Sequence, residues 1–323
     1  MKESAFAVLK VLDESEGTVS KEAIGEALGI PLSAVDEALL ELERLGYDLA
    51  LTEQGYRVRR RSNRLLPYEI QKYLTTQFIG REMWYCERTA STTCIGKQIM
   101  AEKGKHHGMV IIAEEQTGGI GRLGRAWVSP PGGIWITIVL HPEIPIDRLF
   151  MVTMAGSIAV ARALRKEFDI GALIKWPNDI LVGDKKIAGV LLELSAEENT
   201  INYSLLSIGI DANIPLVELS TGLQKAATTL SAELGHEVDR SDLLAAVLKE
   251  LERHYLLLES QEYDTIIREW KSLSSTLEHR VRVKTLTKNF EGEAIDIDDH
   301  GALIVRKDNG AIERVIAGDC QQV

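Results

Sequence analysis

A glycine-rich stretch with two arginines is the part of the sequence best suited to hold an anion. It reads QTGGIGRLGRAW over Gln116–Trp127 and carries Arg122 and Arg125. Glycine backbone amides can approach an anion closely, and guanidinium groups bind carboxylates and phosphates through paired hydrogen bonds. The stretch therefore predicts a site for a carboxylate or a phosphate chain. The alternative is a flexible surface loop.

The spacing of Gly119, Gly121 and Gly124 also satisfies the GxGxxG pattern of dinucleotide-binding proteins. That pattern requires a helix directly after the glycines, because the pyrophosphate lies at the helix N-terminus. Here Ser129–Gly133 (SPPGG) follows, which a helix does not cross, and Ile134–Leu140 then reads as a strand. No Gly-Lys-Ser/Thr follows the glycines, which excludes a Walker A loop. We therefore expect a strand, a loop and a second strand.

A second polar cluster lies in Lys175–Gly189, which begins with the letters KWPND. Asn178 and Asp179 start a predicted strand, and Lys186 and Gly189 lie on the returning arm of the same hairpin. A lysine that enters an apolar strand is costly unless its charge meets an anion, and Asp179 or a phosphate would supply one. The alternative is an exposed lysine on an edge strand.

The elements that must position these residues divide into segments. Residues 1–63 hold three helical patterns followed by two short strand patterns, which together are typical of a winged helix-turn-helix. Ser20 and Ser33 are the expected caps of the second and third helices. The alternative for this segment is a generic helical domain. Residues 64–72 read as a linker.

Residues 73–275 alternate apolar strands with long amphipathic helices such as Leu149–Phe168. Strands joined by tight turns predict a mixed sheet rather than a regular parallel one. Residues 276–323 contain short strands separated by turn residues, which fit a small SH3-like β-barrel. The expected fold class is therefore α+β, with a central mixed-sheet α/β domain between a winged helix-turn-helix and an SH3-like domain.

Composition excludes several classes of protein. The 323 residues include 48 acidic and 37 basic side chains, for a formal net charge of −11, which excludes a globally basic nucleic-acid coat. No run approaches the ~20 apolar residues of a membrane helix, and no signal-peptide cleavage site is evident. The three cysteines form neither a disulfide framework nor a zinc motif. We expect a cytoplasmic protein without a membrane partner and without a metal site built from protein ligands.

Together, Gln116–Trp127 and Lys175–Gly189 resemble the biotin–protein ligase family, and the N-terminal segment resembles its bifunctional form, which also acts as a biotin operon repressor. The resemblance extends over essentially the whole chain and implies a class II synthetase-like catalytic domain. It implies an enzyme that joins biotin to Mg²⁺-bound ATP as biotinyl-5′-AMP and then transfers biotin to a lysine of a biotin carboxyl carrier protein domain. It also implies a homodimer and operator DNA as a partner.

The resemblance assigns roles to individual residues. It implies that Lys186, Arg122 and Asp179 are catalytic, with Lys186 at the biotin carboxylate and the α-phosphate, and Asp179 at the acceptor lysine. The residues expected to bind biotin are Ser91, Thr92, Thr93, Gln116, Ile120, Gly121, Arg122, Lys186 and Gly189. The residues expected to bind ATP or the adenylate are Gly118, Gly119, Arg122, Arg125, Asn178 and Lys186.

Three positions depart from the family pattern. Ile120 stands where the Gly-Arg-Gly-Arg loop has its first arginine, and Thr93 stands where asparagine is common. Asp211 stands where the usual family pattern, Gly-Ile-Gly-Ile-Asn, has its asparagine. Because Arg122 is retained, we expect activity, with changed retention of the adenylate and one altered hydrogen bond to biotin.

The N-terminal segment is poorly charged for DNA. Residues 1–61 carry eight basic and twelve acidic side chains, and the expected recognition helix has Arg44 as its one basic residue. Helices that read bases usually present Arg, Lys, Asn or Gln. The alternative is a role in dimer or partner contacts. The residues expected to bind DNA are Ser33, Arg57, Arg59 and Arg60.

Two other functions stay open at this point. A lipoate–protein ligase-like enzyme would share the catalytic fold, although KWPND favours biotin. A biotin-sensing DNA-binding repressor without turnover would use the ligase domain only to sense biotin. Retention of Arg122, Asp179 and Lys186 together argues for turnover.

Overall fold

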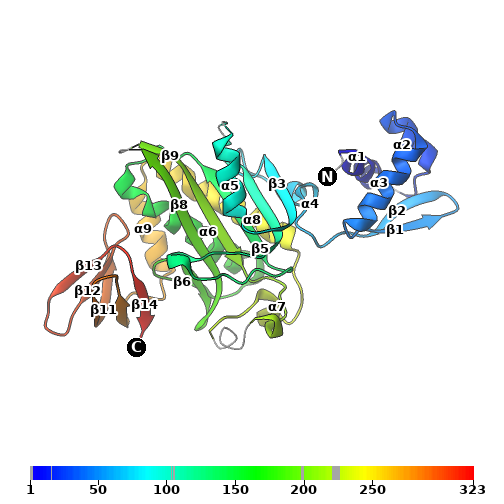
Figure 1. Cartoon of the computed structure of the whole chain (residues 1–323). Coiled ribbons are helices and arrows are strands. Elements are labelled where there is room, and N and C mark those ends of the chain that lie inside the picture. The colour runs from blue at the N-terminus through cyan, green and yellow to red at the C-terminus, as the bar shows by residue number, and fades with distance from the viewer. Residues whose placement is uncertain (1–2, 16, 103, 105, 198–199, 220–225) are drawn as a thin grey trace. The chain divides into compact units, whose positions relative to one another are not determined.

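The computed structural model describes residues 3–15, 17–102, 104, 106–197, 200–219 and 226–323. The chain divides into two compact units, Met1–Tyr68 and Glu69–Val323. Most of their helices and strands are labelled in Figure 1.

The first unit packs helices against one another beside a hairpin (Figure 1). One apolar face of each helix supplies its core, which includes the fully buried side chains of Leu9, Ile24 and Leu42. The two strands of the hairpin pair antiparallel. The elements are α1 (Glu3–Glu14), α2 (Lys21–Leu28), α3 (Leu32–Arg44), β1 (Asp48–Thr52) and β2 (Gly55–Arg60).

Local capping sets the helix boundaries in this unit. The Ser20 hydroxyl accepts a hydrogen bond from the N–H of Ala23 at 3.1 Å, and α2 ends at Gly29, whose φ of 63° is left-handed. The expected cap at Ser33 is wrong. The helix α3 begins one residue earlier, behind Pro31, because the fixed φ of proline suits a helix start. Ser33 is therefore an exposed residue of the first turn.

The expected linker of residues 64–72 contains a helix, α4 (Pro67–Tyr73). Leu66, Ile70 and Leu74 are all buried, and their spacing of four residues is helical. That spacing is the signal which the interpretation as a linker overlooked. The boundary between the two units falls inside α4.

Seven strands in the described part of the second unit form one mixed sheet, in the order β3-β4-β5-β9-β8-β7-β6. The neighbours β3 and β4 are parallel, and the other neighbouring pairs are antiparallel. The mixed sheet predicted from the tight turns is confirmed. The strands are β3 (Met83–Thr89), β4 (Val110–Gln116), β5 (Ile134–Leu140), β6 (Ala172–Lys175), β7 (Asp179–Val182), β8 (Lys185–Glu197) and β9 (Thr200–Ile210).

Helices cover both faces of this sheet (Figure 1). A Cβ on Gly96 of α5 would lie 3.1 Å from the side chain of Leu205, and a Cβ on Gly156 of α6 would lie 3.3 Å from Leu206. Neighbouring residues of a strand point to opposite faces, so α5 and α6 pack on opposite sides of β9. The helices of this unit are α5 (Thr92–Ala101), α6 (Phe150–Phe168), α7 (Leu230–Leu234), α8 (Arg240–Glu259) and α9 (Tyr263–Ser272).

Two buried charged side chains fix α8 against the sheet layer. The carboxylate of Glu252 accepts hydrogen bonds from the backbone N–H groups of residues 77–79, at 2.6 to 2.9 Å. The Arg240 guanidinium donates to the Glu114 carboxylate at 2.9 Å and to the carbonyl of Gly133 at 2.7 Å. Glu114 lies on β4, two residues before Gln116, so this buried pair helps to place the strand that carries the glycine-rich loop.

The C-terminal part is a five-stranded antiparallel sheet in the order β13-β12-β11-β10-β14. Four of its strands were predicted from the sequence, whereas β14 was not. The strands are β10 (Arg280–Lys284), β11 (Asn289–Ile297), β12 (Leu303–Arg306), β13 (Ile312–Val315) and β14 (Asp319–Gln322).

Among all the described residues, no helix combines the length and the apolar character that crossing a membrane requires.

Candidate active site

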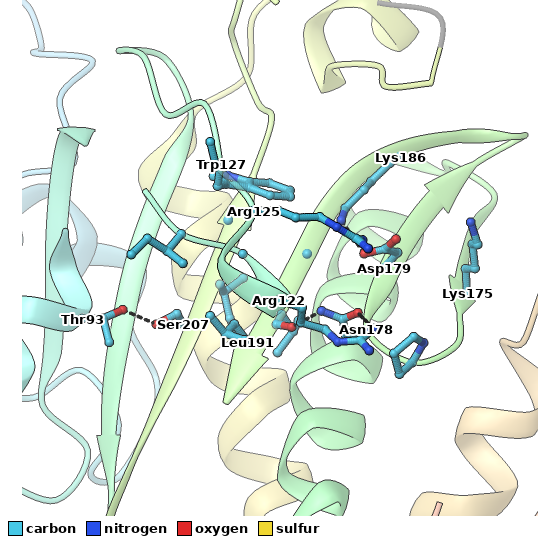
Figure 2. Close-up of a pocket in the computed structure, with 18 of the residues that line it drawn as sticks. Thr93, Arg122, Arg125, Trp127, Lys175, Asn178, Asp179, Lys186, Leu191 and Ser207 are labelled. Carbon is cyan, nitrogen blue, oxygen red and sulfur yellow. Dashed lines mark hydrogen bonds and ion pairs between the residues drawn. The ribbon is translucent and has the colours of Figure 1, made fainter. Parts of the chain in front are cut away.

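A cavity of about 460 Å³ lies where the glycine-rich loop, the β7–β8 hairpin and the start of α5 meet (Figure 2). This volume is typical of a small-molecule site. The cavity brings together most of the residues that the sequence singled out. Those that line it are Ser91, Thr92, Thr93, Gln116, Ile120, Gly121, Arg122, Arg125, Asn178, Asp179, Lys186 and Gly189.

Two predicted residues do not line the cavity. The N–H of Gly118 donates to the carbonyl of Ala90 at 2.8 Å, and the carbonyl of Gly119 accepts from the N–H of Trp127 at 2.8 Å. The backbone of both glycines therefore holds the loop in place. The cavity also has walls that the sequence-based assignment of binding residues missed, including Trp127, Lys175, Trp176, Ser207, Gly209, Asp319, Cys320 and Gln321.

The glycine-rich loop connects β4 to β5, which pair antiparallel, so the predicted strand, loop and strand are confirmed. Within the loop the N–H of Gly121 donates to the carbonyl of Arg125 at 2.7 Å. Between them Leu123 and Gly124 both have left-handed φ values, 56° and 72°. The loop is thus a tight ordered turn whose ends carry Arg122 and Arg125.

Both arginines reach the start of β14. Arg122 donates to the Asn178 side-chain oxygen at 3.2 Å and to the carbonyl of Gly318 at 2.7 Å. Arg125 pairs with the carboxylate of Asp319, with one contact at 3.1 Å. Burial lowers the pKa of Arg122, and the nearby carboxylates act in the opposite direction. A guanidinium remains cationic in proteins, so Arg122 keeps its positive charge. The two arginines thus connect the glycine-rich loop to the start of β14, and Arg122 also contacts Asn178.

Lys186 forms an ion pair with Asp179, and its Nζ lies 4.7 Å from the centroid of the Trp127 ring (Figure 2). A register shift between β7 and β8 sets Lys186 opposite Leu181, which is two residues from Asp179 and on the same face. The bulge therefore turns the lysine toward the carboxylate. The alternative of an exposed edge-strand lysine does not describe this half-buried side chain.

Two glycines make room for the Trp127 indole. A Cβ on Gly189 would lie 3.2 Å from the ring, and a Cβ on Gly209 would lie 2.8 Å from its Nε1. The indole consequently packs against Gly189 and Gly209, which are partners near one end of the β8–β9 pair. Its buried N–H has no partner among the described residues.

Hydroxyl groups at the start of α5 form the other end of the cavity. The side-chain oxygen of Gln116 accepts hydrogen bonds from the backbone N–H of Thr92 at 2.9 Å and from its hydroxyl at 3.1 Å. The hydroxyls of Thr93 and Ser207 lie 2.9 Å apart (Figure 2). This end is polar and uncharged, in contrast to the cationic end at Lys186.

Asp211 follows β9 and is buried, with 5% of its surface exposed. Its N–H donates to the carbonyl of Ile187, and its carbonyl accepts from the N–H of Leu230. Burial raises the pKa of this carboxyl to about 7, and the positive charge of Lys186 works in the opposite direction. At neutral pH this residue therefore lies close to its titration point.

No group of three or more His, Cys, Asp or Glu side chains in the described residues could hold a metal ion. Asp179 and Asp319 are the carboxylates among the cavity-lining residues, and both pair with cations.

Comparisons with known proteins agree with this geometry. A model of the biotin/lipoate A/B protein ligase family matches residues 85–213, and a model of the biotin protein ligase C-terminal domain matches residues 276–321. The bifunctional ligase/repressor BirA of Bacillus subtilis is 31% identical over 305 residues, which cover 94% of this chain and 93% of that protein.

The chain belongs to the biotin–protein ligase family. The family resemblance recognised in two motifs is confirmed. A further member, the bifunctional ligase/repressor BirA of Escherichia coli, is 27% identical and covers 93% of this chain. The biotin protein ligase of Aquifex aeolicus, solved in complex with biotin and ATP, has a TM-score of 0.66 at 24% identity. It covers 75% of this chain and all of its own length, and it supports the family's α+β fold here.

Proposed function

We propose that this cavity joins biotin to AMP and then passes biotin to a lysine of a carboxyl carrier protein domain. The observation that carries the proposal is the convergence of Arg122, Lys186 and Asp179 on one cavity whose opposite end is lined by hydroxyls. Family members named biotin–[acetyl-CoA-carboxylase] ligase, such as that of Paracoccus denitrificans, support the choice of carrier.

In the first step the biotin carboxylate attacks the α-phosphorus of ATP, and pyrophosphate leaves. Carboxylate and phosphates repel one another, so cations must neutralise both. Lys186 would exchange Asp179 for the α-phosphate, and Arg122 would exchange its neutral acceptors for a substrate anion. Removal of one such donor slows the step by roughly a hundredfold or more.

In the second step a neutral lysine of the carrier attacks the acyl carbon of the adenylate, and AMP leaves. Once Lys186 has turned to phosphate, the Asp179 carboxylate is released from its ion pair. It then orients the incoming amine and accepts its proton. Asp179 thus pairs with Lys186 before ATP binds and acts on the acceptor lysine of the carrier in the second step.

Mg²⁺ would enter with ATP and neutralise part of the phosphate charge. The two carboxylates that line the cavity suit a metal carried by the phosphates rather than one held by a set of protein ligands. Asn178 would present its side-chain oxygen at the nucleotide end, because its amide nitrogen is fixed to the carbonyl of Val190 at 2.5 Å.

We further propose that residues 1–63 form a winged helix-turn-helix that contacts operator DNA in a homodimer, and that residues 276–323 form an SH3-like domain. Arg57, Arg59 and Arg60 are exposed on β2, the second strand of the wing, where they would meet phosphates. A salt-dependent gel shift of biotin-operon DNA in the presence of biotin and ATP tests this role. An absence of any shift at low salt contradicts it.

The experiment that tests the enzymatic proposal incubates the full chain with ATP, biotin and a carrier domain. We expect AMP release and biotin on the carrier, both reduced at least a hundredfold in Lys186→Ala. Lipoate in place of biotin should give no product, and a product with lipoate alone would favour a lipoate–protein ligase. Biotin binding without AMP release would favour a repressor that only senses biotin.

A further inference from the structure

Four hydroxyl groups form a connected set at the end of the cavity away from Lys186. Thr137 lies within 2.8 Å of Thr92 and 2.9 Å of Ser207, and Ser207 lies 2.9 Å from Thr93, measured between hydroxyl oxygens. Thr92, Thr93 and Ser207 line the cavity, and the contact between Thr93 and Ser207 is visible in Figure 2. Thr137, on β5, is fully buried and does not line the cavity.

The amide of Gln116 sets the direction of the first hydroxyl. Its N–H donates to the Ser129 hydroxyl at 3.1 Å, and Ser129 gives its own proton to the carbonyl of Trp127. The amide oxygen of Gln116 therefore faces Thr92. Since this oxygen only accepts, the Thr92 hydroxyl must donate to it.

The direction then passes from one hydroxyl to the next, because each carries a single proton. Thr92 has used its proton on Gln116, so Thr137 donates to Thr92. Ser207 consequently donates to Thr137, and Thr93 donates to Ser207. The cavity-facing oxygens of Thr92, Thr93 and Ser207 are left with lone pairs and accept N–H groups from a ligand.

Ser91 has the opposite character. Its buried hydroxyl oxygen accepts the backbone N–H of Thr93 at 3.2 Å. Within the described residues no hydrogen bond uses its proton, so it is available to donate to a carbonyl. A hydroxyl that donates to a carbonyl, beside hydroxyl oxygens that accept N–H groups, is complementary to a urea, in which one carbonyl is flanked by N–H groups.

We propose that Thr137 is a positioning residue which, together with the cavity-lining Ser207, fixes this proton order. The site then selects a ring with N–H groups beside a carbonyl. Biotin has such a cyclic urea, whereas the disulfide ring of lipoate has no N–H group. The inference rests on the proposed function and deepens it, because it names two residues outside Gln116–Trp127 and Lys175–Gly189 that set the choice of substrate.

Calorimetric titration of the full chain with biotin, in the absence of ATP, tests the inference. Thr137→Val keeps the shape of the side chain and removes its hydroxyl, and we expect biotin to bind about tenfold more weakly. Thr137→Ser keeps the hydroxyl and should bind like the wild type. Thr153→Val, in α6 and remote from the hydroxyl set, is the matched control.

A second ligand separates proton order from general loosening of the site. Biotin methylated on a ureido nitrogen lacks one N–H group, and the wild type should discriminate strongly against it. In Thr137→Val the hydroxyls of Ser207 and Thr93 are free to turn, so the discrimination between the two ligands should narrow while kcat stays unchanged and KM for biotin rises about tenfold. Equal losses for both ligands would mean a structural role and overturn the inference.

Ser207→Ala provides an independent variant if Thr137→Val fails to fold, because it removes the donor to Thr137 from a half-buried position. The same tenfold loss and narrowed discrimination are expected. Unchanged binding in this variant, with carrier labelling by the wild type intact, overturns the inference and leaves the enzymatic proposal standing. Selective biotin binding without carrier labelling would support the inference and contradict the enzymatic proposal.

Discussion

Replacing Asp211 by asparagine should change how the stability of the protein depends on pH. Burial raises the pKa of this carboxyl from 3.8 to about 7, so the folded state binds its proton more tightly than the unfolded state. The favourable contribution of the protonated form is complete below pH ~4 and is lost as the pH rises through ~7. Asparagine resembles the neutral form at every pH and escapes this loss.

The size of the effect follows from the shift. A shift of about 3 pKa units at ~1.4 kcal/mol per unit amounts to about 4 kcal/mol in all, of which ~2–3 kcal/mol falls between pH 5 and pH 8. Groups other than Asp211 titrate alike in both proteins, so their contributions cancel when the two free energies of unfolding are subtracted. The stability of Asp211→Asn relative to the wild type should therefore rise from pH 5 to about pH 7 and level off above it.

Urea unfolding followed by tryptophan fluorescence at pH 5, 6, 7 and 8 measures the difference. The control is Asp184→Asn, which makes the same chemical change at an exposed aspartate in the β7–β8 turn. If the difference in free energy of unfolding between Asp211→Asn and the wild type does not change with pH, the reasoning is refuted. Such a result would mean that the buried carboxylate is ionised without cost at neutral pH.

Three other substitutions test the framework of the site. Arg240→Met removes the cation of a buried pair and should lower the free energy of unfolding by about 3–5 kcal/mol in urea titrations. Glu252→Gln replaces a carboxylate that accepts three backbone N–H groups, and a loss of about 1–3 kcal/mol is expected in the same titration. Gly209→Ala forces a methyl group against the Trp127 indole and should raise KM for biotin roughly tenfold or more. Gly171→Ala, which meets open space, should leave that KM unchanged.

The sequence predicted best those features that depend on neighbouring residues. Ser20 and Gly29 bound α2 as expected, because a cap and a left-handed glycine act within one turn. The hairpin that carries Asp179 and Lys186 was also predicted, because its turn lies between two apolar runs. Ser33 failed because Pro31, two residues earlier, determines the helix start more strongly than a serine does.

Features that depend on distant contacts could not be read from the chain. Thr137 reads as an ordinary residue of a buried strand, and its hydroxyl partners come from α5 and β9. Asp319 reads as a turn residue, yet it meets Arg125 in the cavity wall. No periodicity or spacing relates residues that lie so far apart in sequence. The sequence shows that Asp211 departs from the family pattern. Its raised pKa could not be predicted, because it depends on how deeply the fold buries the carboxyl.

The pairing of Arg122 and Arg125 with the start of β14 has a consequence for how the protein is made. The ribosome adds Gly318 and Asp319 well after it has added the cavity walls that lie between Ser91 and Gly209. Until then Arg122 lacks the carbonyl of Gly318, the residue before β14, and Arg125 lacks the carboxylate of Asp319. Both guanidinium groups therefore obtain these partners only after the walls from Ser91 to Gly209 have been made.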